Sequence, residues 1–132
     1  MVIDNSNQNA MKNNAKKPAS FRKEPFHKIA YSTRGVLEVA NIGDIILCEA
    51  QNNYTKISFQ KKAVLLCKSL KQVAKALQPY NFYRVHRHYL VNLNHVSRYN
   101  TKDGRVALPG DRLIKLSLRN RKGFLAALHQ VL

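Results

Sequence analysis

Residues 82–92 of the chain read FYRVHRHYLVN. Two strand-like runs, Phe82–His86 and Tyr89–Leu93, lie on either side of the dipeptide Arg87-His88. Aromatic and β-branched side chains of this kind are typical of β-strands. The stretch therefore predicts two strands in the middle of the chain, and similar short apolar runs on both sides of it predict a β-rich fold.

Toward the N-terminus, short apolar runs are separated by residues that favour turns. After them, Ser69 is predicted to cap a short helix that Pro79 stops. The apolar residues of that helix fall on one face. The predicted strands are Val36–Ala40, Asp44–Ala50, Tyr54–Gln60 and Ala63–Cys67, the turns are Asn41-Ile42-Gly43 and Asn52-Asn53, and the helix face is Leu70, Val73, Ala74 and Leu77.

Toward the C-terminus the same pattern continues. The dipeptide Asp103-Gly104 predicts a hairpin, and Ser117 is predicted to cap a last helix. The fold class is therefore mainly β with two short helices. The predicted elements are strands at Val96–Tyr99, Val106–Leu108 and Leu113–Leu116, a turn at Pro109-Gly110, and a helical stripe of Phe124, Leu125, Leu128 and Leu132.

The composition changes near Lys28. Residues 1–27 are rich in Asn, Ser, Gln and Lys and offer little apolar surface to bury, so we expect a disordered basic tail or linker there. Residues 28–132 are expected to form one domain.

The charge of the chain is strongly positive. It carries 23 Lys and Arg against 7 Asp and Glu, a formal net charge of +16, and residues 50–102 contain no acidic side chain. Because a charge this large opposes compaction, it indicates a polyanionic partner. Nucleic acid is the first candidate, and an anionic membrane surface is the rival.

Cysteines and hydropathy indicate the compartment. Cys48 and Cys67 both lie in apolar runs and are predicted to be buried, reduced thiols rather than a disulfide framework. No apolar stretch reaches the ~18 residues of a membrane span, and residues 1–10 contain no apolar secretory core. We therefore expect a soluble cytoplasmic protein that does not associate with a membrane.

The layout of predicted elements has no helix-turn-helix pair, zinc-finger spacing or leucine zipper. If DNA is the partner, loops or strand ends must supply the contacts.

Three segments resemble the LytTR DNA-binding domain of bacterial response regulators. DIILCEA at 44–50 runs into Asn53-Tyr54-Thr55, similar to the strand, turn and N-Y-T signature of that family. Lys68-Ser69-Leu70 followed by residues 82–92 resembles its F-x-R-x-H-R-S-x-x-V-N motif, and LIKLSLR at 113–119 resembles its closing strand and S-x-R turn. The resemblance covers residues 28–132.

The resemblance implies an elongated fold of three small antiparallel sheets whose loops enter successive major grooves of double-stranded DNA. It also implies a transcription regulator of the two-component type that acts in pairs on repeated half-sites, and is a monomer or weak dimer when free. Two positions depart from the family pattern: His88 stands where Ser is usual, and Leu118 where Arg is usual. The receiver domain that often precedes this module is not in the chain.

Base contacts are predicted for residues that match the contact positions of the family. Arginine can pair with guanine O6 and N7, and asparagine with adenine N6 and N7. The alternatives are phosphate contacts for Arg87 and Arg119, a helix-capping role for Asn120, and turn geometry for the amides. The predicted base contacts are Arg87, Arg119, Asn120, Gln51 and Asn52.

Backbone contacts are predicted for a second set, whose cations set the salt dependence of binding. Turn geometry is the alternative for Asn53, packing for Tyr54, and simple solvation for each lysine and arginine. The predicted backbone contacts are Asn53, Tyr54, Lys56, Lys68, His88, Lys115, Arg121 and Lys122.

No catalytic residue, metal site or cofactor is predicted. His86, His88 and His95 lack zinc-ligand spacing, and His86 is expected to be a core histidine. Arg84 and Asn92 are expected to be structural. The remaining alternatives are a small basic RNA-binding protein, although no RNP signature is present, and a protein-interaction module.

Overall fold

The structure is a computed structural model that describes residues 27–129. Most of the predicted tail lies outside the described residues, as does Leu132 of the predicted helical stripe. The described residues divide into two units, 27–44 and 45–129. The extent of the predicted domain, residues 28–132, stays a prediction.

The first unit is a two-stranded hairpin of β1 (Lys28–Thr33) and β2 (Val36–Asn41). Arg34 and Gly35 connect the strands with φ of 51° and 79°, the left-handed conformation of a two-residue hairpin turn. Strand β1 was not among the predicted strands, because its buried residues are consecutive (29–31) and do not alternate. The turn predicted at Asn41-Ile42-Gly43 is a 3-10 helix, η3 (Ile42–Asp44).

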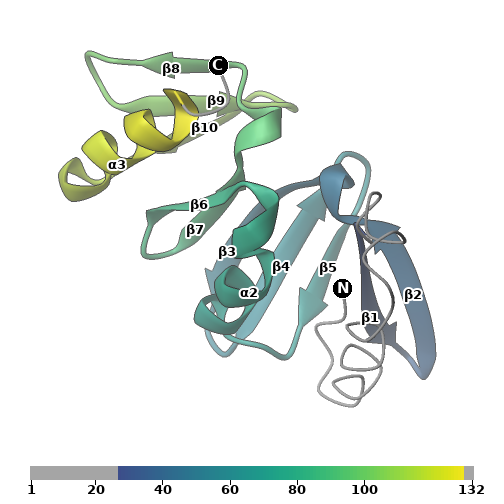
Figure 1. Ribbon diagram of the computed structural model, residues 1–132. Helices are drawn as coiled ribbons and strands as arrows, with labels where there is room; N and C mark the ends of the chain where they lie inside the picture. The colour runs from purple at the N-terminus through teal and green to yellow at the C-terminus, as the bar shows by residue number, and fades with distance from the viewer. Residues whose placement is uncertain (1–26, 130–132) are drawn as a thin grey trace, which may run out of the picture. The chain divides into compact units, whose positions relative to one another are not determined.

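The second unit contains a five-stranded antiparallel sheet with the order β5-β4-β3-β7-β6 (Figure 1). Each of its strands corresponds to a predicted run, and β3 begins at residue 45 rather than at the predicted residue 44. Its strands are β3 (Ile45–Gln51), β4 (Tyr54–Phe59), β5 (Ala63–Leu66), β6 (Phe82–His86) and β7 (Tyr89–Asn92).

Helix α2 (Leu70–Leu77) packs on this sheet and contacts β3, β4, β6 and β7. Ser69 caps it as predicted: the Ser69 hydroxyl accepts from the Gln72 N–H at 3.1 Å, and the Gln72 side chain accepts from the Ser69 N–H at 2.9 Å. This reciprocal pair satisfies N–H groups that the first turn leaves free. The helix ends before Pro79, which lies in the 3-10 helix η4 (Gln78–Tyr80).

A three-stranded antiparallel sheet follows, with the order β10-β9-β8. The predicted strand Val96–Tyr99 is displaced toward the C-terminus, because residues 93–95 form the 3-10 helix η5 (Leu93–His95) and the Asn92 side chain caps it. The predicted hairpin around Gly104 is confirmed, with residues 101–104 as its connection. The strands are β8 (Arg98–Asn100), β9 (Arg105–Leu108) and β10 (Arg112–Lys115).

Helix α3 (Leu118–His129) joins the two sheets of the second unit. Its buried Phe124 belongs to one hydrophobic cluster with residues of both sheets, such as Leu47 and Val106. The Phe124 ring contacts the ring of Tyr83 on β6 and that of Tyr99 on β8, with centroids 6.0 and 5.3 Å apart. The core of the second unit therefore fixes α3 against β6.

The cysteine prediction is half correct. Cys48 is buried in β3, and burial raises the pKa of its thiol, with the nearby Glu49 charge adding to the shift. Cys67 is also unpaired but exposed, because β5 is an edge strand that ends at Leu66. None of the helices among residues 27–129 has the length and apolar character needed to span a membrane.

Candidate nucleic-acid interface

The turn between β3 and β4 projects polar side chains from the end of the five-stranded sheet. Gln51, Asn52 and Asn53 are exposed. Asn52 adopts φ of 55°, a conformation that asparagine tolerates better than most residues. Tyr54 faces solvent with 45% of its surface exposed, so the packing alternative does not describe its side chain.

The turn between β6 and β7 lies beside the first. Arg87 and His88 are both exposed in it. The Ala50 N–H donates to the His88 carbonyl oxygen at 2.9 Å, which links the β3–β4 and β6–β7 turns directly. The turn is also braced from within, because the Arg84 guanidinium donates to the Arg87 carbonyl at 2.8 Å and His86 Nδ1 accepts from the His88 N–H at 3.2 Å. Arg84 is therefore structural, as predicted.

The start of α3 is anchored to β6. Asn120 Nδ2 donates to the Val85 carbonyl at 3.2 Å and to the Ser117 hydroxyl at 2.8 Å. Val85 lies where the register of β6 with β7 shifts, so its carbonyl is directed to α3 by a β-bulge. This role is an anchor and not a helix cap, because the half-buried Asn120 amide donates to Val85 and Ser117 and accepts from no N–H of the first turn of α3.

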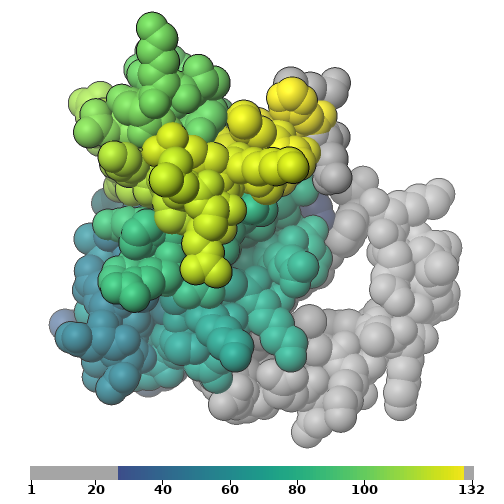
Figure 2. Space-filling view, turned by 90° about the vertical axis from the view of Figure 1, so that its left-hand side faces the viewer, coloured from purple at the N-terminus to yellow at the C-terminus, as the bar shows by residue number. Residues whose placement is uncertain are grey.

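These three segments form one surface, which we call the loop face: residues 51–54, residues 87–88, and the exposed residues 118, 119 and 122 of α3. Figure 2 views the molecule from the side on which they lie, with the start of α3 near the centre and the β6–β7 and β3–β4 turns below it. Two hydrogen bonds place them in a row: the Ala50 N–H joins the β3–β4 turn to the His88 carbonyl, and the Asn120 side chain joins α3 to the Val85 carbonyl.

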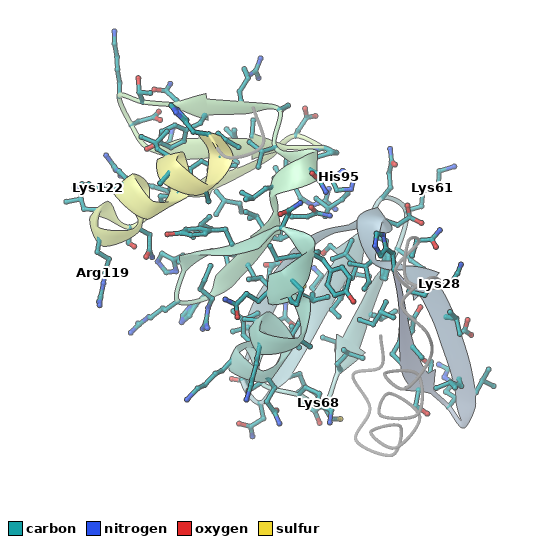
Figure 3. The ribbon with its side chains drawn as sticks, viewed as in Figure 1. Lys28, Lys61, Lys68, His95, Arg119 and Lys122 are labelled. Carbon is teal, nitrogen blue, oxygen red and sulfur yellow. The ribbon has the colours of Figure 1, made fainter. Side chains whose placement is uncertain are left out.

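The loop face is cationic. Arg119 and Lys122 extend from the first turns of α3 into solvent (Figure 3). Arg87 is exposed in the β6–β7 turn, which is hydrogen-bonded to the end of β3 on one side and to α3 on the other. The nearest acid in sequence, Glu49, is partly buried with its carboxylate 3.9 Å from Lys56 Nζ. Among the described residues, the loop face itself carries no carboxylate.

The other predicted backbone contacts lie outside the loop face. The guanidinium of Arg121 occupies the space beside Gly104, 2.5 Å from where the Cβ of any other residue would lie. It also donates to the Asp103 carbonyl at 3.4 Å, so it braces α3 against the β8–β9 connection. Lys56 is half exposed on β4, and Lys68 follows β5, where its carbonyl accepts from the Thr55 hydroxyl at 2.7 Å. Lys115 is exposed on β10 opposite Arg105.

Two residues that position the loop face were not predicted from the sequence. The carbonyl of Val85 accepts the hydrogen bond that anchors α3. The identity of an apolar residue in a strand does not indicate that its carbonyl has such a role. Gly123 lies inside α3, where a Cβ would overlap the Tyr83 hydroxyl. A glycine in the interior of a helix is itself a signal, because it costs about 1 kcal/mol relative to alanine and is retained where another group approaches closely.

Asn120→Ala will lower the free energy of unfolding by about 1–3 kcal/mol, because the Val85 carbonyl loses its donor. Urea denaturation followed by circular dichroism measures this change. Lys122→Ala, an exposed substitution on the same helix, should change stability by less than about 0.5 kcal/mol. If Asn120→Ala keeps its stability and loses affinity for one DNA sequence only, Asn120 contacts a base and the anchoring role is wrong.

Metal ligation has no support in the described part of the chain. Between residues 27 and 129, no three side chains of His, Cys, Asp or Glu come close enough together to hold a metal ion. His86 uses its Nδ1 to accept within the turn, and its ring contacts those of His88 and Tyr89 at centroid distances of 5.5 and 5.7 Å. His86 and His88 therefore contribute to the structure of the β6–β7 turn, while His95 lies apart from them in η5.

Comparison with known proteins agrees with this architecture. The family model of the LytTr DNA-binding domain matches residues 36–129. The fold is similar to a LytTr DNA-binding domain from Bacillus cereus, with a TM-score of 0.66 and 18% sequence identity over 78% of this chain and 97% of that one. A search of curated protein sequences gave no significant match. Because the family model covers most of the chain and the three antiparallel sheets agree with the resemblance in the sequence, the chain belongs to the LytTR family of DNA-binding domains.

Proposed function

We propose that the protein is a sequence-specific transcription regulator that reads double-stranded DNA through the loop face. The observation that supports this most directly is the row of three segments, each with exposed polar or cationic side chains and all held by hydrogen bonds to the backbone within the second unit. Cations neutralise phosphates, while amides and guanidinium groups recognise base edges in the major groove.

The order of the row suggests how the duplex is contacted. The β3–β4 turn and the start of α3 lie at its two ends, with the β6–β7 turn between them. A major groove is only about 12 Å wide, so we propose that the two ends enter successive major grooves and that Arg87 reaches a base at the edge of one of them. In this arrangement Gln51, Asn52, Arg87 and Arg119 contact bases, and Asn53, Tyr54, His88 and Lys122 contact the backbone.

Lys56, Lys68 and Lys115 are proposed to contribute through longer-range attraction for phosphate. For Asn120 and Arg121, the hydrogen bonds within the protein are a better-supported role than DNA contact.

We further propose that two copies act together on repeated half-sites, with the protein a monomer or weak dimer when free. Such a regulator works in the bacterial cytoplasm, where the chromosomal DNA is. A response-regulator role in a two-component system is part of the same proposal, and it needs no cofactor and no catalytic step.

The affinity for DNA will fall steeply with salt. If five to eight phosphates are neutralised, log K should fall against log salt concentration with a slope of roughly −4 to −7, because each contact releases condensed counterions. Fluorescence anisotropy measures this with a labelled duplex selected by the full chain from a randomised double-stranded library.

Two further ligands separate the alternatives. A scrambled duplex should bind more weakly than the selected one at every salt concentration, and a structured RNA should bind no better than the scrambled duplex. Equal affinity for all three would exclude sequence-specific reading, tighter binding to RNA would favour an RNA-binding protein, and a slope near zero would exclude nucleic acid as the partner.

A further inference from the structure

Leu118 is the most exposed of the large apolar side chains in the part of the chain that the structure describes, with 79% of its surface accessible. It is the first residue of α3 and lies on the loop face. Single exposed leucines are common on protein surfaces, so exposure alone assigns no role. The position of Leu118 on the loop face and its cationic neighbours indicate a role.

Leu118 lies beside cationic side chains that would attract a polyanion. Arg119 follows it in sequence, and Lys122 lies one helical turn away on the same side of α3, and both are exposed. Figure 3 shows these two side chains leaving the start of the helix on the outer side of the molecule. A duplex attracted by these cations therefore meets the leucine at the same time.

The backbone under Leu118 is fixed. The Asn120 N–H donates to the Ser117 carbonyl at 3.0 Å, and the Asn120 side chain joins the Ser117 hydroxyl to the Val85 carbonyl. These bonds fix Ser117, which precedes Leu118, and Asn120, which lies two residues after it. The Cβ direction of Leu118 is thus set before any ligand binds, which is the condition for reading a small group with a short apolar side chain.

The chemistry of the major groove offers few apolar partners for such a side chain. Every base edge presents hydrogen-bond donors or acceptors there, and the methyl group at C5 of thymine is the apolar feature that distinguishes one base pair from another. Leucine has no donor or acceptor of its own, so it cannot satisfy the polar edges but can cover this methyl group.

We propose that Leu118 contacts the 5-methyl group of a thymine next to the base pair that Arg119 contacts, and so determines sequence specificity at that position. The inference rests on the proposed DNA-reading function of the loop face. Arg119 supplies attraction and hydrogen bonds, and Leu118 supplies discrimination by shape and apolar contact.

The test uses the duplex that the full chain selects from the randomised library. Each thymine of this duplex is replaced in turn by deoxyuridine, which removes the methyl group and leaves base pairing unchanged. One replacement in each half-site should weaken binding about fourfold, the effect of losing one buried methyl group. For Leu118→Ala, the affinity for the unmodified duplex should be lower, and the same replacement should change it little.

Two variants serve as controls. Leu118→Met keeps an apolar side chain of similar volume and should keep the sensitivity to the thymine methyl. Leu113→Ala removes another exposed leucine, one with 60% of its surface accessible on β10 outside the loop face, and should also keep it. Thermal unfolding of all three variants checks that none has lost its fold.

The outcomes distinguish this inference from the proposed function. If the chain prefers its selected duplex but tolerates every thymine replacement, or if Leu118→Ala keeps the same sensitive thymine, the inference is overturned and DNA reading stands. If Leu118→Ala instead abolishes only cooperative binding of two copies, Leu118 is a protein contact and the inference is again overturned. If no duplex is preferred over the scrambled one, the proposed function itself fails.

Discussion

Arg87→Ala will weaken binding to the selected duplex by about 1–3 kcal/mol, a factor of roughly 5 to 150, because a guanidinium paired with a guanine edge carries that much discrimination. On a scrambled duplex the loss should be much smaller, so the ratio of the two affinities should collapse. The substitution should leave the fold intact, since Arg87 is exposed and the hydrogen bond of the turn uses its carbonyl rather than its side chain. Anisotropy titrations with both duplexes measure the ratio.

Lys122→Ala is the matched control, because it removes the same charge from an exposed residue of the loop face that is proposed to contact only the DNA backbone. It should weaken both duplexes alike and reduce the salt slope by about one unit. Were Arg87→Ala to lower both affinities equally, Arg87 would be a backbone contact. Base reading would then depend on Arg119 and the β3–β4 turn.

Phe124→Ala will lower the free energy of unfolding by about 3–5 kcal/mol, the usual cost of removing a buried aromatic side chain. Phe124 is fully buried and contacts rings from both sheets of the second unit. Its loss leaves a cavity where α3, β6 and β8 meet. Chemical denaturation of the variant and the parent chain gives the difference directly.

Leu118→Ala is the control on the same helix. Because this leucine is mostly solvent-exposed, its removal should change stability by no more than about 0.5 kcal/mol. A small effect of Phe124→Ala would contradict the role of this ring in holding α3 to the sheets.

The sequence predicted the strands of the five-stranded sheet, both helices and the hairpin at Gly104, because those elements follow local rules of apolar runs, caps and turns. The prediction failed where tertiary contacts determine the local structure. Strand β1 buries consecutive residues, and Cys67 is exposed although its neighbourhood in sequence is apolar. Similarly, the Asn92 side chain caps η5 and so displaces the start of β8.

Only part of the candidate site could be predicted from the sequence. The exposure of Gln51, Arg87 and Arg119 follows from their places in turns and at a helix start. The anchoring roles of Asn120 and Arg121 depend on partners 35 and 18 residues away in sequence. A single sequence contains no pattern that joins such residues, so Asn120 was assigned to DNA from the contact positions of the family and Arg121 from its charge.

The hydrogen bond between Ala50 and His88 limits how this protein can acquire a new target during evolution. It lies one residue pair beyond Glu49 and Tyr89, the last pair of β3 and β7, so inserting a residue into either turn would disturb this link between the two turns. An added base pair in the target would displace the contacted bases by about 3.4 Å and rotate them by about 35°, which rigid turns could not follow. Divergence should therefore proceed by exchanging side chains at residues 51–53 and 87–88, while the spacing of the contacted bases is inherited unchanged.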